Sequence, residues 1–218
     1  TMRLAEWAVQ VGVKKFIYAS SGSVYGVSEA PEVTEDTPLN PISDYNKTKM
    51  CAERVLLSYA DKMDVKIVRP ATVCGWSPRM RLDVMVNSFV IQALTKGVIT
   101  YNGGGQYRPN IHIDDMTDLY VWLLERDFSG AIFNAGFENM KIKDIAKMVA
   151  DVIGCKIEPS DSNDKRSYRI NSNKLLVSGF KPKKKVLDAI VELRGKFIEG
   201  ELKDEDTCYR VRSMPKAA

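Results

Sequence analysis

Ser20-Ser21-Gly22-Ser23-Val24-Tyr25-Gly26 follows directly on the apolar run Phe16-Ile17-Tyr18-Ala19, and these two runs decide the fold. An apolar run that ends in small polar residues is typical of a buried parallel strand. A second motif, Tyr45-Asn46-Lys47-Thr48-Lys49, begins a helical pattern that continues to Tyr59. Tyr45 and Lys49 are four residues apart, so on a helix they share one face. Together the motifs predict a serine hydroxyl at a strand's carboxyl end, facing a tyrosine and a lysine on the next helix.

This pairing suits the movement of a proton on and off an alcohol. The base that takes such a proton needs a pKa not far above about 7. Tyrosine ordinarily titrates at about 10, so a nearby cation is needed to favour its phenolate. We therefore predict three catalytic residues: Tyr45 as the base, Lys49 as the cation, and Ser21 as the hydrogen-bonding partner of the reacting oxygen. Either motif alone is common on surfaces and in loops, and their order along the chain is what makes them specific.

Four runs carry a family resemblance: KKFIYASSGSVYG, YNKTK, VKIVRPATVCG and GGGQYRPNIHIDD. In this order they resemble the extended short-chain dehydrogenase/reductases, and among these the NAD-dependent nucleotide-sugar epimerase/dehydratase family. The resemblance extends from residue 2 to about residue 195. It implies an α/β fold, a Rossmann-like doubly wound parallel sheet with a smaller mixed α/β substrate-binding lobe.

The resemblance also implies a division of the chain. We expect residues 1–75 to form the C-terminal part of the dinucleotide-binding domain, with later returns near 111–135. Residues 76–110 and 136–199 would form the nucleotide-sugar lobe, and 200–218 a loosely ordered tail. No G-x-G-x-x-G turn precedes the first strand, although family members carry one there. We therefore expect the sequence to lack about three βα units, roughly 90 residues, and the 218-residue chain not to bind NAD with useful affinity by itself.

The matching positions imply a set of site residues. The cofactor, NAD with NADP possible, would contact Ala19, Ser20, Tyr45, Lys49, Pro70 and Ala71. The nucleotide-diphosphate sugar would contact Ser21, Thr72, Asn87, Arg108 and Arg166. Two of these have simpler interpretations, because Asn87 could be an ordinary polar residue of its helix and Arg108 a surface charge. The single histidine, His112, alternates with isoleucines, so we predict a structural role for it and no metal site.

The residues after Ser21 separate the possible reactions. Sugar 4,6-dehydratases of the family carry an acidic pair where this chain has Gly22 and Ser23, so a dehydratase is disfavoured. A 4-epimerase needs only the serine, tyrosine and lysine beside a tightly held NAD, and is the leading hypothesis. A ketoreductase that uses NADPH needs the same residues and stays open. A truncated, catalytically inactive nucleotide-sugar-binding module is the non-enzymatic alternative.

Composition argues against several other classes of function. The chain has 32 basic and 28 acidic residues and a net charge of +4, too mild a balance to indicate nucleic-acid binding. No apolar run approaches transmembrane length, so no membrane partner is expected. The four scattered cysteines contain no Cys-x-x-Cys pair, which favours reduced thiols and a cytoplasmic protein. The family resemblance further implies a homodimer.

Periodicity predicts the remaining elements. Helices are expected at 2–12, 82–94, 142–153 and 186–198, and strands at 65–68, 98–101, 131–134 and 156–159. A further helix should run to Glu125 and be capped by Asp114 or Asp115. The strands at 15–19 and 65–69 should pair in parallel.

Overall fold

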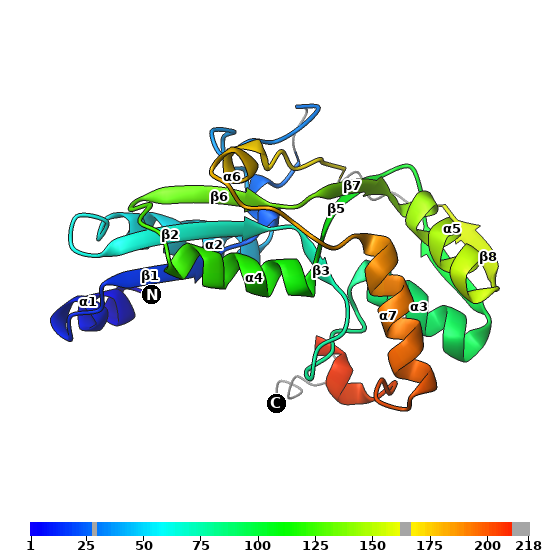
Figure 1. Cartoon of the computed structure of the whole chain (residues 1–218). Coiled ribbons are helices and arrows are strands. Elements are labelled where there is room, and N and C mark those ends of the chain that lie inside the picture. Colours follow the sequence, from blue (N-terminus) through cyan, green and yellow to red (C-terminus); the bar gives the residue numbers. More distant parts are fainter. Residues whose placement is uncertain (28–29, 162–166, 211–218) are drawn as a thin grey trace, which may run out of the picture.

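The protein is described by a computed structural model that covers residues 1–27, 30–161 and 167–210. Its helices, strands and 3₁₀ turns, in chain order, are α1 (Met2–Gln10), β1 (Lys15–Ala19), η1 (Gly22–Tyr25), α2 (Asp44–Leu57), β2 (Asp64–Pro70), β3 (Thr72–Cys74), α3 (Met85–Lys96), β4 (Val98–Asn102), β5 (Tyr107–His112), α4 (Ile113–Leu124), β6 (Ala131–Ala135), β7 (Glu138–Lys141), α5 (Ile142–Ile153), β8 (Lys156–Ser160), α6 (Asn173–Val177), α7 (Val186–Ile198) and η2 (Asp206–Cys208). Figure 1 shows β1, β2 and β6 at one side of the molecule and α3, α5 and α7 at the other.

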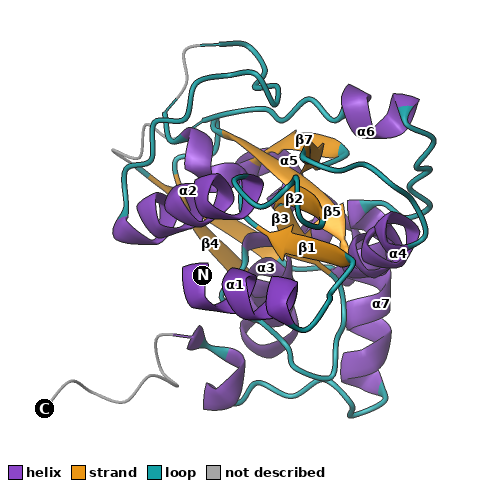
Figure 2. Cartoon of the chain, turned by 90° about the vertical axis from the view of Figure 1, so that its left-hand side faces the viewer, coloured by secondary structure: helices purple, strands orange, loops and turns teal. Residues whose placement is uncertain are grey.

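A parallel sheet in the order β1-β2-β6 forms the first lobe. The predicted parallel pairing is confirmed, with Phe16 opposite Val65 and Ala19 opposite Val68. Alternate residues of β2 face opposite sides, as the pleat requires. Val65 packs with α1 and α2, whereas Val68 packs with α4. Figure 2 shows the strands between α2 and α4. Helices on both faces of a parallel sheet make the fold Rossmann-like, as expected.

The second lobe has its own core beneath α3, α5 and α7. Its described strands form the small sheets β3-β5-β7 and β4-β8, in which β5-β7 is antiparallel and the pairs β3-β5 and β4-β8 are parallel. Helix α5 has apolar side chains at helical spacing, and Ile145, Ala146 and Val149 are buried. The predicted bounds of α5 and α7 agree with the structure. The lobe contains both helices and strands, as expected of a mixed α/β lobe.

Very short links join the lobes between β2 and β3 and between β6 and β7. Only Ala71 separates β2 from β3, and only Gly136 and Phe137 separate β6 from β7. The two links are in contact. The amide of Ala71, in the first link, donates to the carbonyl of Ala135, just before the second link, at 2.8 Å. A Cβ on Gly136 would lie 2.7 Å from the Cβ of Ala71. This close approach therefore requires glycine at position 136.

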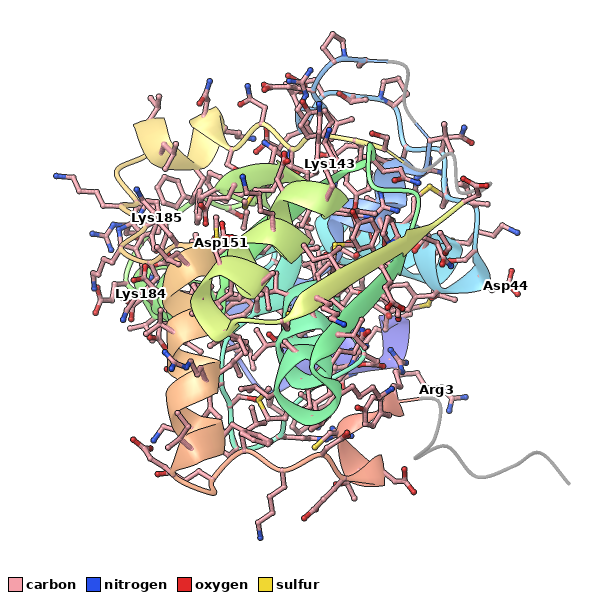
Figure 3. The ribbon with its side chains drawn as sticks, turned by 90° about the vertical axis from the view of Figure 1, so that its right-hand side faces the viewer. Arg3, Asp44, Lys143, Asp151, Lys184 and Lys185 are labelled. Carbon is pink, nitrogen blue, oxygen red and sulfur yellow. The ribbon has the colours of Figure 1, made fainter. Side chains whose placement is uncertain are left out.

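The structure differs from the sequence predictions at several points. The short elements β3, β7 and α6 were not expected. Residues 200–210, expected to be a loosely ordered tail, pack on the second lobe: Leu202 is only 2% exposed, and the Leu82 amide donates to the Cys208 carbonyl at 2.9 Å. The loose-tail prediction is therefore wrong for this part. Lys184 and Lys185 are exposed beside the first turn of α7 (Figure 3). A run of lysines at the start of a helix favours such exposure to solvent.

No helix in the described part of the chain is both long enough and apolar enough to cross a bilayer.

Candidate active site

The serine-rich stretch after β1 forms a tight polar turn. Ser21 caps η1, and its Oγ accepts from the Ser23 amide at 3.2 Å. The hydroxyls of Ser21 and Ser23 are 2.7 Å apart. The Ser23 hydroxyl also donates to Oδ1 of Asn46 at 2.7 Å. A hydrogen-bond chain thus joins the strand end to α2 and fixes the direction of the Ser21 hydroxyl. The parts that Ser23 and Asn46 play in it were not predicted.

Tyr45 and Lys49 lie on the first two turns of α2, which begins after the N-cap Ser43. The Lys49 ammonium donates to the Ala19 carbonyl at 2.7 Å. It also lies 5.7 Å from the centroid of the Tyr45 ring. Burial lowers the pKa of Lys49, and the positive charge of Arg210 lowers it further. The helix therefore holds the ammonium at the open end of β1, beside the predicted base.

A pocket of about 450 Å³ opens at the carboxyl ends of β1 and β2, where α/β sheets bind ligands. The predicted site residues that line it are Ser20, Ser21, Tyr45, Pro70, Ala71, Thr72 and Asn87. The rest of its lining comes from Ser23, from β3, from the loop before α3, from Ile113 at the start of α4 and from Tyr168. None of the described residues that line it is Asp or Glu.

The predicted substrate residues are divided between two hollows. Asn87 borders the main pocket, but its buried amide is engaged by the loop before α3: Oδ1 accepts from the Gly75 amide at 3.1 Å, and Nδ2 donates to the Arg81 carbonyl at 3.0 Å. Arg108 lies in a neighbouring hollow of about 300 Å³ that shares Thr72 with the main pocket. Arg166 lies outside the described residues.

A buried polar network supports the strand ends and was not predicted. Glu53 of α2 and Arg69 of β2 are 2% and 3% exposed. The Arg69 guanidinium donates to Glu53 at 2.6, 3.0 and 3.3 Å, and to the Tyr25 hydroxyl at 2.9 Å. The Ser20 hydroxyl donates to the same carboxylate, and Tyr25 donates to Asn134 at 2.7 Å. A glutamate on the buried stripe of a helix and an arginine inside an apolar strand are the sequence features that could have indicated this pair.

Opposing effects act on the pKa values within this network. Burial raises the pKa of Tyr25 above its usual value, and Arg69 offsets part of that rise. For Arg69, burial is the largest effect and lowers the pKa, but the hydrogen bonds and charge interactions with Glu53 and Tyr25 together outweigh it, and the net shift is upward. The guanidinium is therefore a permanent charge that depends on Glu53 for compensation.

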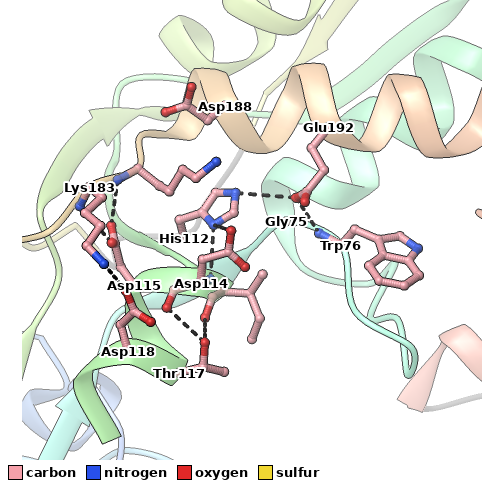
Figure 4. Close-up of polar contacts among 12 residues, drawn as sticks. Gly75, Trp76, His112, Asp114, Asp115, Thr117, Asp118, Lys183, Asp188 and Glu192 are labelled. Carbon is pink, nitrogen blue, oxygen red and sulfur yellow. Dashed lines mark hydrogen bonds and ion pairs between the residues drawn. The ribbon is translucent and has the colours of Figure 1, made fainter. Parts of the chain in front are cut away.

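His112 joins the two lobes (Figure 4). Its Nδ1 accepts from the Asp114 amide at 3.1 Å and so caps α4. Histidine is thus the cap, and the prediction that Asp114 or Asp115 fills this position is wrong. Nε2 of His112 lies 3.4 Å from Glu192 of α7, and the same carboxylate oxygen accepts from the Trp76 amide at 3.1 Å. These contacts agree with the structural role predicted for the ring.

The residues present fit the reactive end of a nicotinamide cofactor. The Lys49 ammonium, the hydroxyl-bearing Tyr45 and the exposed Ala19 surround the open end of β1, and β1 lies at the edge of its sheet. The pyrophosphate of a dinucleotide is usually held by a helix that begins after a strand and a glycine-rich turn. No helix among the described residues begins in this way. The residues described therefore fit the nicotinamide half and supply no glycine-rich pyrophosphate cradle.

Comparison with known proteins agrees with this geometry. The model of the NAD dependent epimerase/dehydratase family matches residues 1–136. The chain belongs to this family. As a family member it is 28% identical to a UDP-glucose 4-epimerase of Lactobacillus helveticus over 82% of the chain and 62% of the relative. It is 29% identical to the dTDP-D-glucose 4,6-dehydratase of Mus musculus over 83% of the chain and 54% of the relative. The chain thus spans less than two thirds of either relative.

Solved structures of the same architecture overlie most of this family member. MoeE5 in complex with UDP-glucuronic acid and NAD is 26% identical, with a TM-score of 0.78, over 91% of this chain and 70% of that one. The NAD complex of Thermus thermophilus UDP-glucose 4-epimerase has a TM-score of 0.75 over 89% and 68% of the two chains. At 23% identity the second likeness concerns the fold alone.

Proposed function

We propose that this family member carries the proton-transfer residues and the sugar-nucleotide pocket of an NAD-dependent nucleotide-sugar epimerase. The observation that carries the proposal is the convergence of Ser21 and Tyr45 on one pocket, with the Lys49 ammonium 5.7 Å from the Tyr45 ring. Tyr45 takes the proton of the sugar hydroxyl and later returns it. Ser21 holds the reacting oxygen by a hydrogen bond, and Lys49 supplies a positive charge that favours the tyrosine's anionic form.

NAD, when bound, would accept and return a hydride at the sugar carbon. Tyr45, Lys49, Pro70 and Ala71 are the residues proposed to hold its nicotinamide end. Thr72 is proposed to contact the sugar. The solved relative that binds both UDP-glucuronic acid and NAD supports these two ligand classes.

The lining of the pocket favours epimerisation over dehydration. A 4,6-dehydratase must also move protons at neighbouring sugar carbons, which requires an acid and a base beside Ser21. The pocket's described lining contains no carboxylate. The next residues, Gly22 and Ser23, offer only a buried backbone and a hydroxyl that is bonded to Asn46.

The test is turnover of UDP-glucose and dTDP-glucose by the protein in its natural full length, wild type and Tyr45→Phe. We expect a 4-epimer by NMR and no 4-keto-6-deoxy product. Loss of the proton-transferring oxygen should lower kcat by about 10²–10⁴-fold, with substrate affinity unchanged. Tyr59→Phe, a change just past the end of the same helix and away from the pocket, is the control and should keep full activity. Near-wild-type turnover by Tyr45→Phe would show that another group is the base.

A further inference from the structure

The ring of Tyr45 has a cation from each lobe beside it. Nζ of Lys49, on the same helix, lies 5.7 Å from the ring centroid. The central carbon of the Arg210 guanidinium lies 5.9 Å from the same centroid. Lys49 is part of the motif that the sequence predicts, whereas Arg210 reaches the ring from the far end of the described chain. The predicted base therefore has a charged neighbour that the proton transfer described above does not use.

Arg210 belongs to an arm, residues 200–210, that is anchored to the second lobe. The Cys208 carbonyl accepts from the Leu82 amide at 2.9 Å, and the Arg210 amide donates to the Asp83 carboxylate at 3.2 Å. The backbone of Arg210 is thus fixed to the loop before α3, and its side chain extends from there to the tyrosine. The arm therefore brings a charge of the second lobe to the reacting centre of the first.

The charge of Arg210 acts in opposite directions on a lysine and on a phenol. Burial lowers the pKa of Lys49, and the positive charge of Arg210 lowers it further, because a like charge disfavours the ammonium. A cation beside a phenol has the reverse effect, since it favours the anion that forms when the proton leaves. Two unit charges about 6 Å apart in water shift such an equilibrium about threefold, and a less polar surrounding strengthens the effect.

Other charged and titratable groups lie near these side chains. The Lys49 ammonium is 4.9 Å from the centroid of the Tyr18 ring, but burial and then the charge of Glu53 raise the pKa of this phenol, so it stays neutral at pH 7. The carboxylate of Asp83 is engaged by Arg81 through two hydrogen bonds of 2.6 and 3.1 Å. The start of α2 carries an exposed ion pair, and the pocket has two arginines from the loop before α3: Asp44 with Lys47, and Arg79 with Arg81. Lys49 and Arg210 are the cations that the described contacts place at the Tyr45 ring.

We propose that Arg210 is a positioning residue for the proton transfer, and that its guanidinium and Lys49 together stabilise the anionic form of Tyr45. The inference rests on the proposed function in taking Tyr45 as the base. It adds that the second lobe supplies a charge to the reaction, so the proton transfer is fully supported only while the arm is packed on the loop before α3. Arg210 acts through Tyr45 and needs no contact with the sugar or the cofactor.

The first measurement is kcat for UDP-glucose from about pH 6 to about pH 10, with the protein in its natural full length. In Arg210→Gln we expect kcat to fall about threefold at the acidic end, where the fraction of anionic Tyr45 limits the rate. The loss should disappear at the alkaline end, where the tyrosine is ionised in both proteins. Arg210→Lys keeps the charge and should recover most of the rate. Lys203→Ala removes a positive charge from an exposed position of the same arm, and this control should behave as the wild type does.

The second measurement needs no turnover. It follows the titration of Lys49 by NMR with isotope-labelled lysine, and Lys49→Arg assigns the signal. Lys49 should release its proton at a higher pH in Arg210→Gln than in the wild type, because the neighbouring charge is gone. Arg210→Lys and Lys203→Ala should leave this titration unchanged.

Two results would overturn the proposal. A loss of kcat in Arg210→Gln that is equal at every pH would indicate a packing role alone, and an unchanged Lys49 titration would show that the charge does not act on this centre. Failure of the proposed function is a separate outcome. If Tyr45→Phe kept its activity, the assignment of the base would be wrong, while a shifted Lys49 titration would still place the charge of Arg210 at this centre.

Discussion

Breaking the buried pair of Glu53 and Arg69 should destabilise the whole first lobe. In Glu53→Ala, the Arg69 guanidinium stays buried and loses donor contacts of 2.6, 3.0 and 3.3 Å. Two good hydrogen bonds between charged groups at about 1.5–3 kcal/mol each suggest a loss of about 3–6 kcal/mol. Breaking a buried ion pair typically costs about 3–5 kcal/mol. We therefore expect the free energy of unfolding to fall by about 3–5 kcal/mol, a large part of an ordinary domain's stability.

Urea unfolding, followed by far-UV circular dichroism, measures this loss. Replacing both partners, as in Glu53→Leu with Arg69→Met, should recover at least about 2 kcal/mol relative to the sum of the single changes, because no uncompensated charge remains. Asp118→Ala, which breaks an exposed pair with Lys183, is the control and should cost far less, because solvent screens exposed ion pairs. A loss below about 1 kcal/mol for Glu53→Ala, or strict additivity in the double variant, would refute the reasoning.

Three further results are expected. Burial acts to raise the pKa of Asp83, but hydrogen bonds from Arg81 and the Arg210 amide outweigh it and lower the pKa. Asp83→Asn should therefore reduce stability in urea titrations at pH 7, and the difference should vanish as the pH falls below about 4, through the lowered pKa. Burial raises the pKa of the Cys74 thiol to about 12, so iodoacetamide at pH 8 should label the exposed Cys51 and spare Cys74 by mass spectrometry; equal labelling of the native protein would contradict this. Gly26→Ala should lower the melting temperature more than a matched change at Gly97, because both have positive φ but only Gly26 faces a backbone carbonyl; equal shifts would refute the steric argument.

Local sequence patterns were enough to predict the elements that carry the reacting groups. The apolar run before Ser20 and the matching run at 65–68 indicated two buried strands, and their parallel pairing is confirmed. Only β2 is buried, because β1 lies at the edge of the sheet and its residues are half-buried or exposed. Helices α5 and α7 have apolar residues at helical spacing over three turns, and their bounds followed from that periodicity. Strands β3 and β7 are only three and four residues long. Each is held by pairing with β5, a tertiary contact that no local pattern encodes.

Part of the pocket could likewise be predicted from local sequence patterns. Ser21 and Tyr45 belong to compact motifs, so their meeting could be inferred from a strand followed by a helix. Arg210 could not, because it reaches Tyr45 only after η2 has packed against the loop before α3. The buried pair of Glu53 and Arg69 was missed, although the position of the glutamate on the buried stripe of its helix and of the arginine inside an apolar strand could have indicated it.

The pairing of β6 with β2 also bears on how the chain folds during synthesis. Between these neighbouring strands the ribosome must deliver β3, α3, β4, β5 and α4. Until Ala135 has emerged, β2 has a partner on one edge only, and the backbone groups of its other edge stay open to water and to other nascent chains. Contacts between such distant segments form slowly, and the open edge is prone to aggregation in the meantime. The first lobe is therefore completed late in translation, and a chaperone that shields β2 during that interval should raise the yield of folded protein.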